Sequence, residues 1–102
     1  VLSLARNILA KIPGSGDGRS LVLMSHYDSA GHSSPGASDA ASGVGTILEG
    51  VRAFLSNNED HVNDIIILIT DAEEIGLLGA RLFLRRMGHR ESYGVRERSK
   101  MK

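Results

Sequence analysis

Residues 65–74 have the sequence IIILITDAEE, a run of branched apolar residues with three acids in its last four positions. A continuous apolar run of this length predicts a strand that is buried on both faces. Two adjacent carboxylates, Glu73 and Glu74, follow the strand and must point in different directions. One could hold a metal ion while its neighbour handles a proton, provided that other ligands lie nearby. The upstream candidates for those ligands are His26 and Asp39.

Each of these residues also has a purely structural interpretation. Glu73 and Glu74 could occupy the first turn of a helix, where acids meet the positive end of the helix dipole. Residues 70–73 even fit a capping box. Asp39 could cap the helix that follows it, and His26 could be an ordinary surface histidine. The local sequence leaves both kinds of interpretation open.

The rest of the chain predicts the order strand, strand, helix, strand, helix. Residues 5–12 favour a strand, with a short helix as the alternative, and residues 20–25 favour a second strand. A loop rich in glycine and serine follows over residues 27–38. Apolar residues then recur at helical spacing, and these are Val44, Ile47, Leu48, Val51, Phe54 and Leu55. After the strand at 64–70, a second amphipathic helix is predicted to end near Gly88.

This order of elements predicts where the candidate ligands meet. A strand–helix–strand unit of this size predicts a parallel pair of strands. In open α/β sheets, ligands bind beyond the carboxyl ends of the strands. His26 follows one such strand, and Glu73 and Glu74 follow the next. Asp39 lies in the loop that enters the intervening helix. We therefore predict an α/β fold in which these groups meet at one rim.

Composition and charge exclude several classes of protein. The chain has 102 residues, no net charge at pH 7 and no cysteine, which excludes disulfides and thiolate metal sites. No apolar run approaches the ~20 residues of a membrane span, and no signal-peptide pattern is present. Residues 85–102 hold seven Lys or Arg against two Asp or Glu. Because this segment lacks a binding motif, we expect a solvated, disordered tail that binds no nucleic acid.

Three motifs resemble the M28 family of zinc aminopeptidases, and they are His26-Tyr27-Asp28, Pro35-Gly36-Ala37-Ser38-Asp39, and DAEEIGLLGA over residues 71–80. The resemblance covers roughly residues 6–84 and is nearest to the bacterial and vacuolar-membrane or endoplasmic-reticulum type. It implies a partial three-layer α/β/α fold around a mixed sheet, with residues 1–84 in the catalytic domain and 85–102 outside it. It also implies a peptide substrate and a subgroup whose members are often membrane-associated or extracytoplasmic.

The resemblance implies a role for each candidate residue. His26 would bind one zinc ion, with Asp28 orienting its ring, and Glu74 would bind a second zinc ion. Asp39 would bridge the two ions with its two carboxylate oxygens. Glu73 would be the general base that takes a proton from a water activated by both ions. The complete enzyme would thus release N-terminal residues from peptides.

The chain departs from the family pattern in two respects. Ala40 stands where many members have Asp or Asn, and the family's further acidic ligand and late His have no counterpart before residue 102. His89, Glu91 and Glu97 lack the family context, so we do not assign them as ligands. We therefore expect a truncated chain that is inactive by itself.

Two other functions remain open at this point. A non-enzymatic remnant or binding module would keep the scaffold with little or no affinity for zinc. A related amidohydrolase of the zinc carboxypeptidase type would act on substrates that have a free carboxyl end. The measured number of bound metal ions distinguishes the non-enzymatic module from an enzyme. The substrates that are cleaved distinguish the amidohydrolase from an aminopeptidase.

Overall fold

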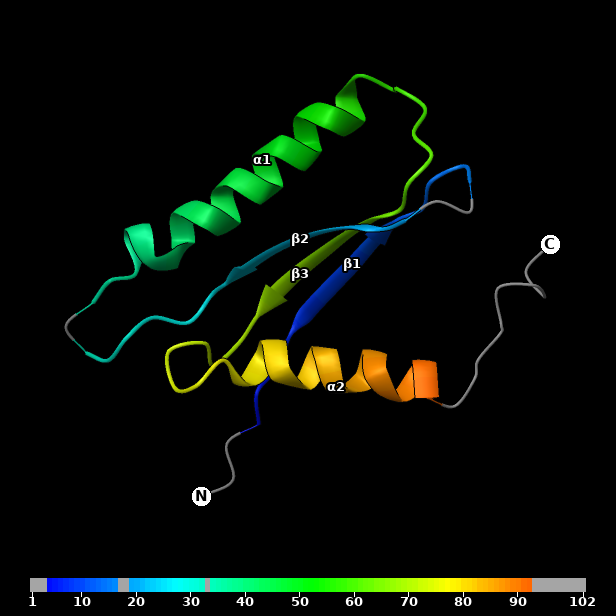
Figure 1. Ribbon diagram of the computed structural model, residues 1–102. Helices are drawn as coiled ribbons and strands as arrows, with labels where there is room; N and C mark the ends of the chain where they lie inside the picture. Colours follow the sequence, from blue (N-terminus) through cyan, green and yellow to red (C-terminus); the bar gives the residue numbers. More distant parts are fainter. Residues whose placement is uncertain (1–3, 17–18, 33, 93–102) are drawn as a thin grey trace.

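The computed structural model describes residues 4–16, 19–32 and 34–92. The elements follow the predicted order (Figure 1), and they are β1 (Ile8–Ile12), β2 (Leu21–His26), α1 (Ser42–Ser56), β3 (Ile65–Thr70) and α2 (Leu78–Ser92). A π-type turn, η1 (Ala37–Ala41), directly precedes α1. The predicted α/β class is therefore confirmed.

The three strands form a mixed sheet with the order β1-β3-β2. The central strand β3 pairs antiparallel with β1 and parallel with β2. The parallel register places His26 opposite Thr70, so that β2 and β3 end side by side. Parallel strands need a crossover connection, and α1 supplies it. The carboxyl ends of β2 and β3 thus share one rim, as the sequence predicts.

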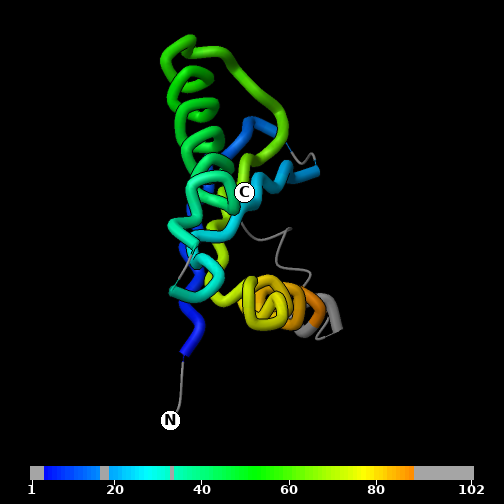
Figure 2. Tube along the Cα trace, turned by 90° about the vertical axis from the view of Figure 1, so that its left-hand side faces the viewer, coloured from blue at the N-terminus to red at the C-terminus, as the bar shows by residue number. Residues whose placement is uncertain are grey.

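The two helices cover opposite faces of the sheet, which gives three layers (Figures 1 and 2). Successive residues of a strand point to opposite faces. Ser25 faces α1, and its Oγ would lie only 2.6 Å from a Cβ added at Gly43. Leu9 and Leu68 face α2, where they line an open cavity of about 510 Å³. The structure is therefore a small α/β/α fragment.

The buried core is concentrated in the central strand β3. Leu68 is 1% exposed and Ile69 is 5% exposed, and Ile65 is also buried. By contrast, large apolar side chains on the flanking strands, such as Leu9 and Met24, remain exposed. Among the described strands, β3 is the central one, with β1 on one edge and β2 on the other. The prediction of a strand buried on both faces is confirmed.

Helix α2 begins at Leu78, well after the capping box that the sequence suggests over residues 70–73. The backbone has positive φ at Ala72, Gly76 and Leu77, and a right-handed helix cannot continue through such residues. Glu73 and Glu74 therefore lie in a loop between β3 and α2. The interpretation that places these acids in the first turn of a helix is wrong.

At its other end, α2 continues to Ser92, one turn past the predicted end near Gly88. The basic segment therefore begins inside the helix. Residues 93–102, where the sequence predicts a disordered tail, lie outside the described residues. The division of the chain at residue 84 stays a prediction. In the part of the chain that the structure describes, neither helix has the length and apolarity needed to cross a bilayer.

Candidate metal centre

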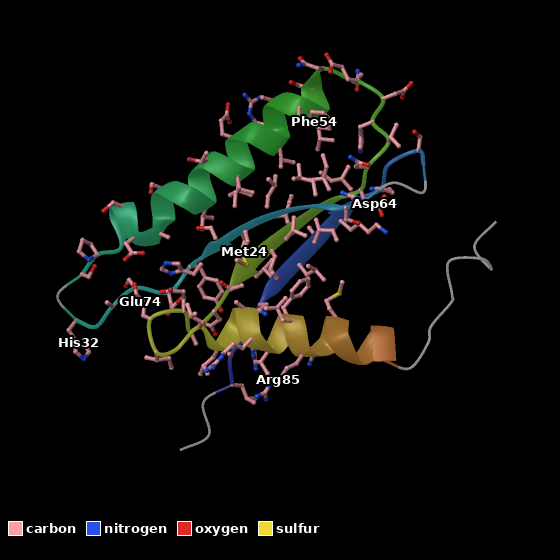
Figure 3. All side chains as sticks on the ribbon, viewed as in Figure 1. Met24, His32, Phe54, Asp64, Glu74 and Arg85 are labelled. Carbon is pink, nitrogen blue, oxygen red and sulfur yellow. The ribbon has the colours of Figure 1, made fainter. Side chains whose placement is uncertain are left out.

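Three of the predicted ligands lie together at the carboxyl ends of β2 and β3. His26 is the last residue of β2, Asp39 lies in η1, and Glu74 lies in the loop after β3. Figure 3 labels Glu74 in that loop. One ligand atom from each residue lies within 4.8 Å of the other two. Two ligand atoms of a tetrahedral zinc ion, each about 2.1 Å from it, are about 3.4 Å apart. The three side chains therefore reach a common metal ion after shifts of about 1 Å.

Both ring nitrogens of His26 have partners. Nδ1 is 2.9 Å from the backbone carbonyl oxygen of Asp28, and Nε2 is 2.9 Å from Oδ1 of Asp39. A carbonyl oxygen only accepts hydrogen bonds, so Nδ1 must donate, and Nε2 is the nitrogen that a neutral ring offers to a metal. Burial alone would lower the pKa of His26, but its bonds to Asp28 and Asp39 and the charge of Glu73 raise it.

Asp28 connects His26 to the loop that carries the two glutamates. Its Oδ1 accepts the backbone N–H of Glu73 and its Oδ2 accepts that of Glu74, both at 3.1 Å. Oδ1 also lies 3.4 Å from Nδ1 of His26. Burial opposes the ionisation of Asp28, but the two N–H groups and His26 lower its pKa below the usual value. The Asp28 carboxylate thus contacts the imidazole and accepts the backbone N–H groups of both glutamates.

Glu74 has one carboxylate oxygen that is buried without compensation. Its Oε1 accepts no hydrogen bond from any of the described residues. Burial and the negative charges of Asp39 and Glu73 raise the pKa of Glu74. An unpaired buried carboxylate oxygen destabilises the fold, and a bound cation would remove that penalty. This orphaned oxygen is the structural observation that favours a metal ion at the cluster.

Asp39 does not cap α1, as one interpretation of the sequence would have it. The helix begins at Ser42 after the N-cap residue Ala41, and no side chain caps it. The Asp39 carboxylate instead contacts His26, and the Asp39–Ala40 peptide bond is cis. The capping interpretation is wrong, and Asp39 is free to take part in the cluster.

Other candidate residues do not join this cluster. His32, labelled in Figure 3, lies in the loop between β2 and η1 and points away from Glu74. Glu73 approaches His26, with its Oε2 at 3.7 Å from Nε2, but it is not one of the three ligands within mutual reach. His89 and Glu91 lie on α2 with side chains outside the described set, and Glu97 lies beyond it.

The sequence analysis did not identify Asn7, which contacts the two ends of the loop that carries Glu73 and Glu74. Asn7 hydrogen-bonds to Asp71 and Gly79, which flank the loop of the two glutamates. These contacts join residues 64 and 72 positions apart, so no local pattern around Asn7 could have indicated them.

Fold and site together define an α/β fragment that gathers one histidine and several carboxylates at the end of a parallel strand pair. This chain matches the sequence model of peptidase family M28 over residues 7–98. The match covers most of the 102 residues, and the chain therefore belongs to that family. The family resemblance of the three sequence motifs is thereby confirmed.

Proteins similar in sequence to this chain include vacuolar membrane proteases and a leucine aminopeptidase. The chain is 35% identical over 81 residues to vacuolar membrane protease of Yarrowia lipolytica and 39% over 83 residues to that of Candida albicans. It is 39% identical over 85 residues to leucine aminopeptidase 1 of Pyrenophora tritici-repentis. These alignments cover 76%, 79% and 74% of this chain but only 8%, 9% and 22% of the relatives. No solved structure matches the chain.

Proposed function

We propose that this chain supplies the general base and several metal ligands of a zinc aminopeptidase that removes N-terminal residues from peptides. The observation that carries the proposal is the meeting of His26, Asp39 and Glu74 at one rim, with Glu73 beside them. Membership of peptidase family M28 supports a metal-dependent peptidase. The name leucine aminopeptidase, borne by one group of relatives, supports the aminopeptidase type.

His26, Asp39 and Glu74 are the residues that would hold zinc. An imidazole nitrogen with carboxylate oxygens, and no thiolate, is a donor set typical of catalytic zinc. Asp39 has two oxygens and a largely exposed carboxylate, which suits a ligand shared by two ions. Bound zinc supplies Lewis acidity and lowers the pKa of coordinated water towards neutrality.

Glu73 would act as the general base. Its carboxylate lies beside the ligand cluster, and Asp28 fixes its backbone N–H. A carboxylate in hydrogen-bond reach of the attacking water accepts a proton and later delivers it to the leaving amine. The water oxygen bonds to the peptide carbonyl carbon, and the C–N bond breaks. One water proton passes through Glu73 to the leaving amine, and the other belongs to the new carboxyl group.

The aminopeptidase type is supported by the name leucine aminopeptidase and not by the charge of the rim. Bound zinc ions would offset the negative charge of the carboxylates around His26, so that charge does not separate an aminopeptidase from a carboxypeptidase-type amidohydrolase. Activity on substrates with a free carboxyl end would favour the second type.

The replacement Glu73→Gln tests the proposal in a protein that carries this sequence within a whole catalytic domain. We expect kcat on an amino-acid anilide to fall by about 10²- to 10⁴-fold, because general-base catalysis contributes an acceleration of that size. The zinc content should stay unchanged, since Glu73 is not assigned as a ligand. The exposed Glu59→Gln is the matched control. An unchanged kcat in Glu73→Gln would reject the role of general base.

The isolated 102-residue chain serves as a second test. Three protein ligands leave two four-coordinate zinc ions incompletely bound, so we expect no release of amino acids from anilides by this chain. Measurable zinc-dependent release would contradict that expectation. A chain that binds no zinc at all would instead favour a non-enzymatic scaffold, and equilibrium dialysis against zinc measures this directly.

A further inference from the structure

The loop that carries Glu73 and Glu74 leaves the sheet and returns through a narrow neck formed by Asp71 and Gly79. The N–H of Gly79 donates to the carbonyl oxygen of Asp71 at 3.0 Å, which closes one side of the neck. Asn7 closes the other side. Its Oδ1 accepts the N–H of Asp71 at 3.1 Å, and its Nδ2 donates to the carbonyl oxygen of Gly79 at 2.8 Å.

We infer that Asn7 is a positioning residue for the site proposed above, and the inference rests on that proposed function. The amide of Asn7 binds one donor and one acceptor across the neck, so it fixes the separation and the orientation of the two loop ends. Between these ends lie the proposed base and one proposed ligand. Asn7 touches neither carboxylate, and it acts through the loop backbone alone.

The packing around Gly79 shows how closely the neck is built. A Cβ at Gly79 would overlap Oδ1 of Asn7 and the carbonyl oxygen of Asp71, and it would lie 2.8 Å from the Asp71 nitrogen. Gly79 is also buried. Only a residue without a side chain allows the first turn of α2 to approach Asp71 and Asn7 this closely.

Neighbouring contacts tie the same segment to β2. The carboxylate of Asp71 accepts the N–H of Arg6 at 2.9 Å and the N–H of Ala72 at 2.8 Å. The hydroxyl of Tyr27, the residue after His26, donates to the carbonyl oxygen of Arg6 at 2.8 Å. The stretch before β1 therefore connects to both strand ends that carry the site, and Asn7 is the residue in it that binds both Asp71 and Gly79.

The loop needs such support because its backbone is irregular. Ala72 and Leu77 have positive φ, an arrangement that L-residues adopt only when the surroundings hold them there. Asp28 binds the middle of the loop through the N–H groups of Glu73 and Glu74. Asn7 holds its two ends, so the base and the ligand are fixed from two directions. Replacing residues that orient metal ligands typically lowers metal affinity by about 10- to 100-fold.

The test uses the full 102-residue chain with Asn7→Ala, and with Asn57→Ala as the matched control. Asn57 is exposed at the end of α1, far from the neck. We measure zinc affinity by competition with a chelator, and amide hydrogen exchange at Asp71 and at Leu68 in the core. For Asn7→Ala we expect faster exchange at Asp71, unchanged exchange at Leu68, and zinc affinity lower by about tenfold or more.

The outcomes separate this inference from the proposed function. If the unaltered chain binds zinc and Asn7→Ala binds it as tightly as Asn57→Ala does, Asn7 has no positioning role. If the unaltered chain binds no zinc, the proposed function is rejected, whatever the result for Asn7. If exchange at Asp71 is slow in the unaltered chain and equally slow in Asn7→Ala, the inference that Asn7 holds the two loop ends together is rejected as well.

Asn7→Asp decides the question if Asn7→Ala does not fold. The aspartate keeps an acceptor for the N–H of Asp71 but presents an oxygen in place of the donor to Gly79. We expect protection at Asp71 to persist while zinc affinity falls by about tenfold, the lower end of the range typical of residues that orient ligands. Zinc affinity equal to that of the unaltered chain would overturn the inference.

Discussion

Helices α1 and α2 are equally long, at 15 residues each, and cover opposite faces of one sheet, yet they contact that sheet differently. α1 lies close against β2, because Gly43 brings its backbone next to Ser25. α2 approaches the sheet closely at Gly79, and it leaves a cavity of about 510 Å³ above Leu9 and Leu68. Figure 2 shows the two helices on their separate sides.

The difference indicates that the candidate site depends on the first turn of α2, at Gly79, and not on the packing of the rest of that helix. Both glutamates lie in the loop before that helix begins, and the contacts that hold them come from Asp28 and Asn7. The buried apolar residues belong to β3. Stability and site geometry should therefore respond to different substitutions, and the following predictions test this separation.

The largest expected effect is on stability and comes from the sheet beneath α2. Leu68 is 1% exposed, so Leu68→Ala should lower the free energy of unfolding by about 2–5 kcal/mol. Leu84, on α2, is 65% exposed, and Leu84→Ala should change the free energy of unfolding by no more than about 0.5 kcal/mol. Urea denaturation measures both. Equal losses would show that α2 packs as tightly as the core strand.

The second effect concerns the loop that leads into α2. Asp28→Asn replaces one carboxylate oxygen by an NH₂ group, which cannot accept the N–H of Glu73 or Glu74. We expect zinc affinity to fall by about 10- to 100-fold, measured by chelator competition. The exposed Asp60→Asn removes the same charge and serves as the control. If both variants lost affinity equally, net charge would explain the result and orientation would not.

A third, smaller effect distinguishes two glycines of α1. A Cβ at Gly45 meets no atom within 4 Å, so Gly45→Ala should stabilise the chain by about 0.4–1 kcal/mol. A Cβ at Gly43 would displace Ser25 Oγ from its hydrogen bond to the carbonyl oxygen of Ala40. Gly43→Ala should therefore be less stable than Gly45→Ala by about 1 kcal/mol. Thermal unfolding of both variants measures this, and the reverse order would contradict close packing of α1.

The smallest effect is expected on the outer surface of α1. Arg52 binds Glu49 at 2.7 Å and lowers the pKa of that carboxyl group. A lowered folded-state pKa stabilises the fold above the unfolded pKa, and this contribution is lost as pH falls through the lowered value. Solvent screens the exposed pair, so Arg52→Ala should leave unfolding unchanged. In an NMR titration, the pKa of Glu49 should return towards its ordinary value, and no change would contradict the pair.

Much of the arrangement could be predicted because it depends on periodic patterns and on chain order. The apolar run at Ile65–Thr70 indicated the central strand, and the helical spacing after Gly43 indicated α1. A strand–helix–strand unit then requires a parallel pair whose carboxyl ends meet. His26 and Glu74 follow the two strands of that pair, so their proximity follows from topology.

The details that could not be predicted depend on contacts between distant residues. Ala72 and Leu77 adopt positive φ, which their residue types do not favour, so the sequence also permitted a helix with Glu73 and Glu74 in its first turn. Asp39 resembles an N-cap locally but contacts His26 across the rim. Asn7 is an ordinary polar residue in the sequence, and its role depends on contacts with residues more than sixty positions away.

The alignment of His26 with Thr70 has a consequence for how the molecule is made. The proposed ion-binding group is divided among three stretches of polypeptide, and it forms only after both strands and the crossover have taken their correct positions. A slip of one residue would turn the imidazole to the opposite side of the sheet. Metal added during refolding would therefore bind only correctly threaded molecules and enrich them by mass action. The amount of metal bound during refolding would therefore also measure the fraction of molecules that have folded correctly.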